Sequence, residues 1–327
     1  MTLMMTLMKH LRCAIAALTL AAPAIGPALA AETVTVGTVG SASANLWPMF
    51  IGIKKGFFAE ADLKIDLIYI QSSAQVIQQL TSGSLDLTVS TGLVDPIRAI
   101  DKGSPIAIVR LEAQSPPYAL VAKPEIKTLE ALKGKVISVG GPKDITRIYV
   151  ERMLTPHGVK PGEFDMVFAG ATSARAQALL AGAVDAAIIL PPFNFQATAR
   201  GFNELALSVD YSPELPFSGS VVSLAWAKAH PAELQRLLAA HNKAIAWFED
   251  DRNRAEAVQI MVAASGLKPD EVEKSYDFFR KGHVFETTGR VSRKRLGALV
   301  DALVGLGDIK HIEVERLVLP GTTKLTD

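Results

Sequence analysis

Apolar and polar residues alternate along the chain with two different periods. In residues 33–39 valines alternate with threonines over most of the segment, and this period of two is typical of a β-strand with one buried face. In residues 74–81 the apolar Val76, Ile77 and Leu80 have the spacing of one helical face, which predicts an amphipathic helix. The chain therefore opens with strands and helices in turn.

Both patterns recur, and after about residue 230 only the helical one continues. Strands are expected at residues 33–39, 63–70, 85–89, 105–111, 118–122, 136–139, 166–168 and 184–190. Helices are expected at residues 46–55, 74–81, 94–102, 128–132, 144–157, 173–180, 192–200, 231–249, 253–265, 269–280 and 292–306. Alternating strands and helices favour parallel sheets. Because they form two runs, 33–117 and 122–190, we expect two α/β lobes.

Residues 1–31 have a different composition from the rest of the chain. Lys9 and Arg12 are followed by an apolar run over residues 13–22 and then by small residues up to Ala30. A basic start, a short apolar stretch and a small-residue site are typical of a secretory signal peptide. The apolar run is too short for a good membrane span. We therefore expect export and cleavage after Ala30 or the next residue.

The overall composition excludes several classes of protein. The 327 residues are 49% hydrophobic and 20% charged, which excludes a disordered chain. A net charge of +1 gives no electrostatic footprint for nucleic acid. Loss of residues 1–31 would remove Lys9, Arg12 and the single cysteine, Cys13, and leave a net charge of −1. The exported chain would then form no disulfide and no cysteine zinc site.

Motifs for catalysis, cofactors and metals are missing from the sequence. It contains no phosphate-binding loop, no dinucleotide-binding glycine motif and no nucleophile elbow. No two histidines after residue 31 have ligand spacing, so we expect no metal site and no cofactor. A catalytic triad assembled from distant residues stays open at this point.

Small polar residues gather where predicted strands pass into predicted helices. These junctions are residues 41–45, 71–73, 90–92, 140–146 and 170–173. In open α/β sheets ligands bind outside the carboxyl ends of the strands, where helix N-termini present free N–H groups. The junctions therefore predict a site for a small polar or anionic ligand. The alternative is that these residues are ordinary helix caps.

Several motifs, in order, resemble one family. They are Trp47-Pro48, residues 56–63, residues 80–86, residues 120–124, residues 132–139 and residues 178–187. This series resembles the extracytoplasmic solute-binding proteins of nitrate/sulfonate/taurine-type ABC transporters, including the alkanesulfonate-binding members. The wider family includes a pyrimidine-precursor branch related to thiamine synthesis.

The resemblance implies a type II periplasmic binding protein, with two α/β lobes joined by two hinge strands. Residues 1–31 would be the signal peptide, residues 32–120 with 219–327 lobe 1, and residues 121–218 lobe 2. It implies a periplasmic monomer, not an enzyme, that captures a small ligand and meets a membrane permease transiently. It implies no cofactor and no nucleic-acid partner. Two alternatives stay open: a ligand-sensing module for a membrane receptor, and a pyrimidine-precursor synthase-like enzyme.

The resemblance also suggests the residues that contact the ligand. They are Trp47, Ser72, Ser73, Thr91, Gly92, Gly140, Gly141, Lys143, Asp144, Arg147, Pro192 and Phe193. Trp47 is interpreted either as a stacking platform for the ligand or as a hydrophobic wall of lobe 1. Among the basic residues near the predicted cleft, which include Arg110 and Arg175, we prefer Lys143 or Arg147 as counter-ion if the ligand is an anion.

Overall fold

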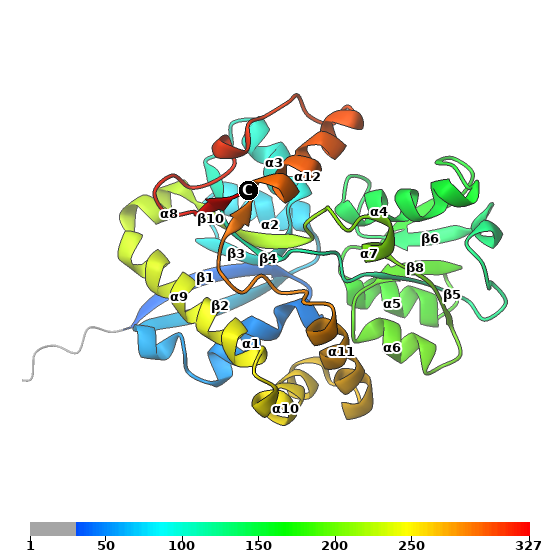
Figure 1. The fold of residues 1–327 in the computed structure, drawn as a ribbon, viewed down its shortest axis with the longest axis horizontal. Helices are drawn as coiled ribbons and strands as arrows, with labels where there is room; N and C mark the ends of the chain where they lie inside the picture. Colours follow the sequence, from blue (N-terminus) through cyan, green and yellow to red (C-terminus); the bar gives the residue numbers. More distant parts are fainter. Residues whose placement is uncertain (1–30) are drawn as a thin grey trace, which may run out of the picture. The chain divides into compact units, whose positions relative to one another are not determined.

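The computed structural model describes residues 31–327. Cys13 and all of the predicted export segment except Ala31 lie outside the described residues. The described residues form two five-stranded sheets, each covered by helices (Figure 1). This confirms the expectation of two α/β lobes. Within residues 31–327 no helix combines the length and the apolar character needed to cross a membrane.

The first sheet has the strand order β2-β1-β3-β10-β4. Its strands are β1 (Glu32–Val39), β2 (Leu63–Ile70), β3 (Leu87–Gly92), β4 (Ile106–Ala113) and β10 (Ser218–Ser223). β1 is parallel to β2 and β3, whereas β10 is antiparallel to β3 and β4. A strand from much later in the chain thus lies near the middle of this sheet.

The second sheet has the order β7-β6-β8-β5-β9. Its strands are β5 (Ala119–Ala122), β6 (Val136–Val139), β7 (Asp165–Phe168), β8 (Ala186–Ile189) and β9 (Asn203–Leu207). β6 is parallel to β7 and β8, and β5 is antiparallel to β8 and β9. The prediction of parallel sheets is therefore only partly right. Each sheet also contains an antiparallel strand, β10 in the first sheet and β5 in the second, and each of these is the first strand after a crossing between the sheets.

The chain crosses between the sheets twice, from β4 to β5 through residues 114–118 and from β9 to β10 through residues 208–217. The two crossings lie side by side. The backbone nitrogen of Ser208 donates to the oxygen of Tyr118 at 2.9 Å, and that of Phe217 donates to the oxygen of Ala113 at 2.9 Å. Two adjacent, hydrogen-bonded connections suit a hinge between lobes.

Helices cover both sheets. Those between β1 and β10 are α1 (Trp47–Lys54), α2 (Ser73–Thr81), α3 (Val94–Asp101), α4 (Ile145–Leu154), α5 (Thr172–Leu180), α6 (Phe193–Thr198) and α7 (Ser208–Tyr211). The later ones are α8 (Leu224–Ala229), α9 (Pro231–Phe248), α10 (Arg254–Ser265), α11 (Pro269–Lys281) and α12 (Arg293–Gly305). A small parallel pair, β11 (Val291–Ser292) and β12 (Leu325–Thr326), lies near the C-terminus.

Short elements account for most differences from the predicted pattern. The predicted helix at residues 128–132 is a single 3₁₀ turn, Glu130–Leu132, and the helix predicted at 144–157 ends in another, Thr155–His157. Other 3₁₀ turns lie at Ala44–Leu46, Ala59–Ala61, Asp251–Asn253 and Val314–Arg316. Sequence reasoning missed β9 because this edge strand is short, partly exposed and begins with polar residues. The four long helices predicted after residue 230 are confirmed by α9 to α12.

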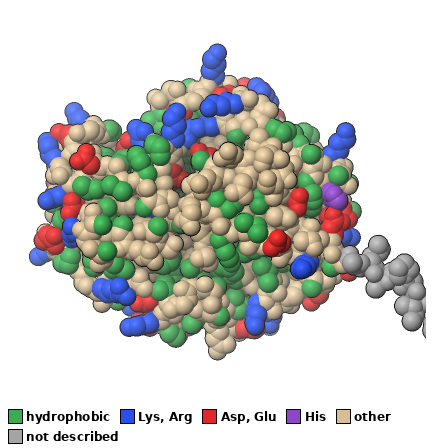
Figure 2. All heavy atoms as spheres, turned by 180° about the vertical axis from the view of Figure 1, so that it is seen from behind, with side chains coloured by type: hydrophobic (Ala, Val, Ile, Leu, Met, Phe, Trp, Pro, Cys, Tyr) green, Lys and Arg blue, Asp and Glu red, His purple; other side chains and the backbone are tan. Residues whose placement is uncertain are grey.

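Charge is distributed over the surface without a dominant sign. On the face shown in Figure 2, acidic and basic side chains are both spread among apolar and uncharged atoms. This agrees with a net charge of only +1 for the full chain. Selectivity for a ligand must therefore come from local groups and not from a field of the whole molecule.

Candidate functional site

A small inner cavity of about 40 Å³ lies between the two sheets. One side is lined by Asn45 in the 3₁₀ turn after β1, by Ser73 at the start of α2 and by Ser90 in β3. The other side is lined by Asp144 and Arg175, from α4 and α5 of the second lobe. The predicted strand-to-helix junctions of both lobes thus meet at one polar cavity.

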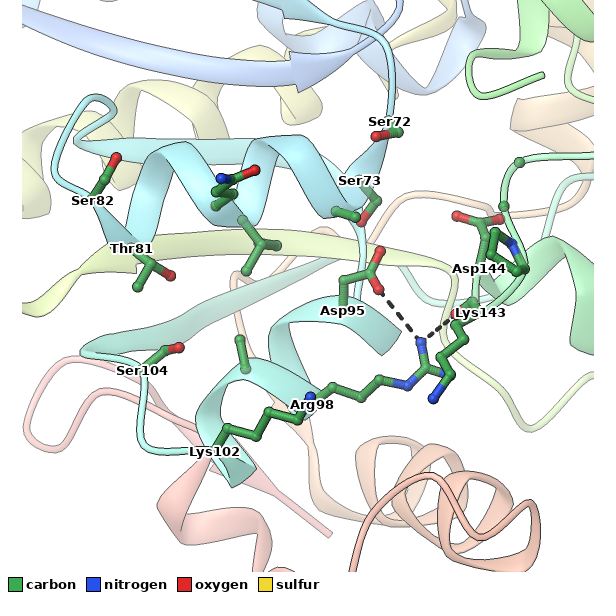
Figure 3. Close-up of a pocket in the computed structure, with 17 residues that line it drawn as sticks. Ser72, Ser73, Thr81, Ser82, Asp95, Arg98, Lys102, Ser104, Lys143 and Asp144 are labelled. Carbon is green, nitrogen blue, oxygen red and sulfur yellow. Dashed lines mark hydrogen bonds and ion pairs between the residues drawn. The ribbon is translucent and has the colours of Figure 1, made fainter. Parts of the chain in front are cut away.

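A larger cavity of about 860 Å³ opens beside the inner one (Figure 3). Both cavities share the lining residues Ser72, Ser73, Gly140 and Asp144. The outer cavity adds charged groups, among them Asp95, Arg98, Lys102 and Lys143. The two cavities therefore adjoin each other at the junction of the lobes.

The lobes touch across this region. The backbone nitrogen of Ala44 donates to the oxygen of Pro191 at 2.9 Å. Arg98 donates to the carbonyl oxygen of Lys143. A Cβ atom placed on Gly170 would lie 2.4 Å from the carbonyl oxygen of Gln71, so only glycine allows this approach. The described structure is therefore a closed arrangement of the two lobes.

The structure brings about half of the predicted site residues together. Those that line either cavity are Ser72, Ser73, Gly92, Gly140, Gly141, Lys143 and Asp144. Those that line neither cavity are Trp47, Thr91, Arg147, Pro192 and Phe193. Four of this second group, all except Arg147, are buried in the structure. Their apolar or small side chains pack into the lobes.

Trp47 lies in the core of the first lobe. Its side chain is fully buried, and the indole nitrogen donates to the carbonyl oxygen of Ala257 at 2.7 Å. Its ring centroid lies 5.2 Å from that of Phe248 and 5.9 Å from that of Tyr276. Of the two interpretations of Trp47, the hydrophobic wall describes this environment, because α9, α10 and α11 enclose the ring.

Ser90 is held in a conformation unusual for a residue with a side chain. Its φ is +50°, which costs free energy for any residue except glycine. The carboxylate of the fully buried Glu112 accepts from the Ser90 nitrogen at 2.8 Å and lies 2.5 Å from its hydroxyl oxygen. The same hydroxyl lies 2.9 Å from the carbonyl oxygen of Asn45. Glu112 thus positions two residues that line the inner cavity.

Arg175 forms the floor of the inner cavity on the second lobe. It is 3% exposed. Its Nε donates to the Ile188 oxygen at 2.7 Å, one terminal nitrogen donates to the Thr172 hydroxyl at 2.7 Å, and the other donates to the Gly170 oxygen. The guanidinium also lies 5.7 Å from the ring centre of Tyr118. Burial raises the pKa of Tyr118, so this phenol stays protonated.

The other basic residues considered as counter-ions already have partners. Arg147 contacts Glu151 at 2.7 Å, donates to the carbonyl oxygen of Pro142 at 3.0 Å, and lines neither cavity. Lys143 lies 3.4 Å from Asp308 with its side chain 65% exposed. Arg110 is fully buried and donates to backbone oxygens inside the first lobe.

Asn45, Ser90 and Arg175 line the inner cavity but were not among the predicted contacts. Asn45 and Ser90 belong to junctions that the sequence pattern had singled out, and Arg175 lies two residues after another of these junctions. Glu112 lies near the end of β4, and nothing in its sequence neighbourhood marks it. Its role depends on the pairing of β4 with β10 and on the approach of β3.

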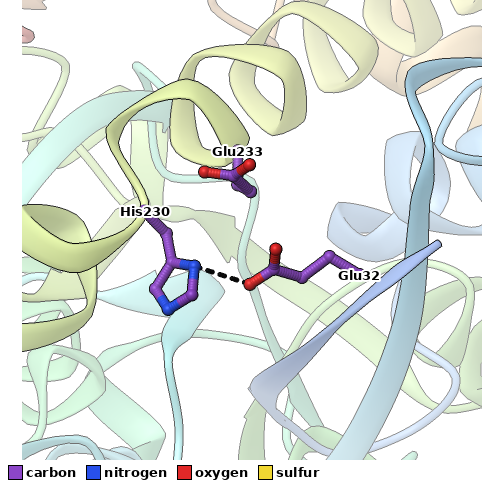
Figure 4. Close-up of side chains that lie close together, drawn as sticks. All are labelled: Glu32, His230 and Glu233. Carbon is purple, nitrogen blue, oxygen red and sulfur yellow. Dashed lines mark ion pairs between the residues drawn. The ribbon is translucent and has the colours of Figure 1, made fainter. Parts of the chain in front are cut away.

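One cluster of metal-type ligands lies elsewhere in the described part of the chain. Glu32, His230 and Glu233 place their ligand atoms within 4.8 Å of one another (Figure 4). The His230 Nδ1 atom is 2.6 Å from Glu32, and Glu233 contacts Arg236 at 3.2 Å. Each member therefore already has a charged or hydrogen-bonding partner without a metal.

Two α/β lobes, joined by two adjacent crossings and closed over a polar cavity, define the periplasmic-binding-protein fold. Within that class, the chain belongs to the family described as NMT1/THI5 like, whose model matches residues 43–255. A search of curated proteins finds no match.

Solved structures share the fold at low sequence identity. The alkanesulfonate-binding protein SsuA of Xanthomonas axonopodis pv. citri, bound to MOPS, matches with a TM-score of 0.72 and 19% identity, over 90% of this chain and 99% of that one. The nitrate-binding protein NrtA of Synechocystis PCC 6803 matches with a TM-score of 0.63 and 16% identity, over 75% of this chain and 70% of that one.

An enzyme also has this architecture. The desulfurization enzyme DSZB matches with a TM-score of 0.64 and 14% identity, over 89% of this chain and 97% of that one. The fold therefore supports both binding and catalysis, and the function must be argued from the site.

Proposed function

We propose that this protein is the periplasmic substrate-binding component of an ABC importer. It would capture a small polar or anionic organic solute between its lobes, as a monomer and without a cofactor, and deliver it to a membrane permease. The observation that carries this proposal is a polar cavity lined from both lobes that contains buried side-chain atoms without partners. The Asn45 Oδ1 and Ser73 Oγ atoms are such atoms, on side chains 4% and 6% exposed.

Capture would work by domain closure. The groups of the first lobe, such as Ser73 and Ser90, and those of the second, such as Asp144 and Arg175, reach one ligand together only when the lobes are closed. A ligand that contacts both sets therefore shifts the hinge equilibrium toward the closed form. Buried polar atoms that lack partners are costly, so a ligand that satisfies them gains affinity in this form.

The test is a scattering measurement of the radius of gyration with and without ligand. Candidate solutes from the classes bound by the family, sulfonates, nitrate and pyrimidines, are first screened for binding. The expected result is compaction on binding. A tightly bound solute that produces no compaction would contradict capture by closure.

The predicted signal peptide supports a periplasmic location. Its removal is tested by N-terminal sequencing of the protein purified from the periplasm, with Ala31 or Glu32 expected as the first residue.

Two other functions are separated by direct assays. A sensor would bind the same ligand but would stimulate a membrane receptor instead of ATP-driven uptake in reconstituted vesicles. An enzyme related to the pyrimidine-precursor branch would release a product of changed mass. The cavity residues of this chain include no cysteine and no histidine, so the lining offers neither a thiol nucleophile nor an imidazole base.

A further inference from the structure

One carboxylate of the first lobe reaches the second lobe by two routes. Asp308 follows α12 and lines neither cavity. Its Oδ1 atom lies 3.4 Å from the ammonium nitrogen of Lys143, which belongs to the loop before α4 of the second lobe. Its Oδ2 atom pairs with the guanidinium of Arg98, and another nitrogen of that guanidinium donates to the Lys143 carbonyl oxygen. The side chain and the main chain of Lys143 are thus both held from the first lobe.

Arg98 is a fixed donor of the first lobe. It lies on α3, is 8% exposed, and has a second carboxylate, that of Asp95, at 3.4 Å. Figure 3 shows its side chain extending from α3 to the segment of Lys143. A planar guanidinium held by two carboxylates has a set direction for its remaining N–H groups. Arg98 therefore presents a donor to the second lobe whether or not a ligand is bound.

The loop that carries Lys143 is tied to the rest of the second lobe. The Gly140 nitrogen donates to the Thr146 hydroxyl at 2.8 Å, and Arg147 donates to the Pro142 oxygen at 3.0 Å. Both partners lie in the first turn of α4. A contact with Lys143 therefore acts on the whole second lobe and not on a loop that moves by itself.

These contacts lie away from the hinge. Near the opposite end of α12, Arg295 donates to the oxygen of Gln114 at 2.6 Å and to that of Pro213 at 2.7 Å, one in each crossing between the lobes. α12 has 13 residues, which corresponds to a length of about 20 Å. A rotation about the crossings therefore separates Asp308 from Lys143, whereas the contacts of Arg295 lie at the pivot.

Building on the proposed function, we infer that Asp308, Arg98 and Lys143 form an interlobe latch, which stabilises the closed lobes even without a ligand. Asp308 and Arg98 are positioning residues, because they hold the second lobe and not the ligand. The Lys143 side chain is 65% exposed, and exposed ion pairs contribute little. The ligand-free protein is therefore a mixture of open and closed forms, which a ligand still shifts. By raising the closed fraction beforehand, the latch increases the apparent affinity.

The experiment uses the ligand-free protein. Small-angle scattering curves of the exported chain and of Asp308→Asn are fitted as mixtures of a compact and an extended form. Loss of the charge that joins Arg98 to Lys143 should lower the compact-to-extended ratio about fivefold. The difference should shrink in 1 M salt, where charges are screened beyond about 3 Å. A ligand-free Asp308→Asn protein as compact as the original chain would overturn the inference.

Two further variants locate the effect. The control is Glu163→Gln, which removes an ion pair with Lys133 at 2.8 Å inside the second lobe and should keep the original ratio. Lys143→Met removes the ammonium group but keeps the carbonyl oxygen that accepts from Arg98, so the ratio should fall less than in Asp308→Asn. This exposed change also decides the question if Asp308→Asn does not fold. A ratio in Lys143→Met equal to that of the original chain would contradict the assignment.

Addition of a solute separates this inference from the proposed function. Methanesulfonate, nitrate and uracil are added at saturating concentration to the same samples. If one of them compacts both proteins while their ligand-free ratios are equal, capture by closure stands and the latch is wrong. If Asp308→Asn is more extended without ligand but a solute that binds compacts neither protein, the latch stands and capture by closure is wrong.

Discussion

The carboxylate of Glu112 accepts a hydrogen bond from the backbone nitrogen of Ser90 at 2.8 Å, inside the first lobe. Ser90 lines the inner cavity, whereas Glu112 lies behind it and is 1% exposed. Glu112 also accepts from the hydroxyl of Ser220 on β10. One buried carboxylate thus connects three strands of the sheet and stabilises the left-handed backbone of Ser90.

Replacing this carboxylate should loosen the loop at Ser90. Glu112→Gln retains the shape but gives up one of the two acceptor oxygens, so we expect a loss of about 1–3 kcal/mol in the free energy of unfolding. Amide hydrogen exchange should also become faster at residues 89–92. Glu125→Gln, at an exposed position, is the control. Unchanged exchange at Ser90 would show that Glu112 does not hold this backbone.

Gly170→Ala should hinder closure. The added Cβ would meet the carbonyl oxygen of Gln71 at 2.4 Å, across the lobes, and the φ of +66° adds strain in either state. The matched control is Gly182→Ala, which has a φ of +75° but no atom within 4 Å of its Cβ. Both variants should lose about 1 kcal/mol of stability from backbone strain.

Only Gly170→Ala should also lose ligand affinity and remain extended in scattering when ligand is added. Equal effects of the two variants on affinity would mean that contact between Gly170 and Gln71 is not part of closure.

Trp47→Phe should affect stability and not ligand binding. The change leaves the Ala257 carbonyl without its donor and opens a gap beside Phe248, so we expect a loss of about 2 kcal/mol or more in urea unfolding. Ligand affinity, measured by calorimetry on the folded protein, should stay within a factor of about two. Trp247→Phe, at a partly exposed tryptophan, should cost less. A large loss of affinity with normal stability would instead favour a ligand-stacking role for Trp47.

The buried His241 should make stability depend on pH. Burial lowers its pKa from 6.5 to about 4, and the nearby charge of Arg110 acts in the same direction. The unfolded chain binds a proton at His241 more readily than the folded chain does. The contribution of His241 to the free energy of unfolding is therefore complete above about pH 6.5 and is lost as the pH falls toward 4. Its full size is on the order of 3 kcal/mol.

The measurement is urea unfolding at several pH values between 7 and 4. His241→Gln should show a shallower decline than the original chain, whereas His311→Gln, at an exposed position, should leave the decline unchanged. Equal slopes in all three proteins would contradict the role of His241. The comparison among variants removes the contribution of carboxylates, which titrate in all three proteins.

Local sequence predicted the long elements well. The helices after residue 230 were placed correctly because each carries an apolar stripe and begins or ends at proline or glycine. The junctions that contain Ser73, Ser90 and Asp144 were also recognised, since polar residues that follow a strand lie at the ligand-binding edge of an α/β sheet.

Pairings between distant segments were not visible in the sequence. Trp47 is buried against Ala257 and Phe248, and Lys143 forms an ion pair with Asp308. These partners lie more than a hundred residues away. No local pattern of hydrophobicity or charge can show which residues the fold will bring into contact.

The sequence by itself therefore determined which segments form strands and helices and which junctions carry polar groups, because these features depend on residues close in the chain. Only the tertiary structure decided that Asp95 and Asp144 line the same cavity from opposite lobes, that Arg175 is surrounded by acceptors, and that Ser90 depends on Glu112. Contacts of this kind arise when two lobes, built from interleaved parts of the chain, close on each other, and their energies depend on distance and burial.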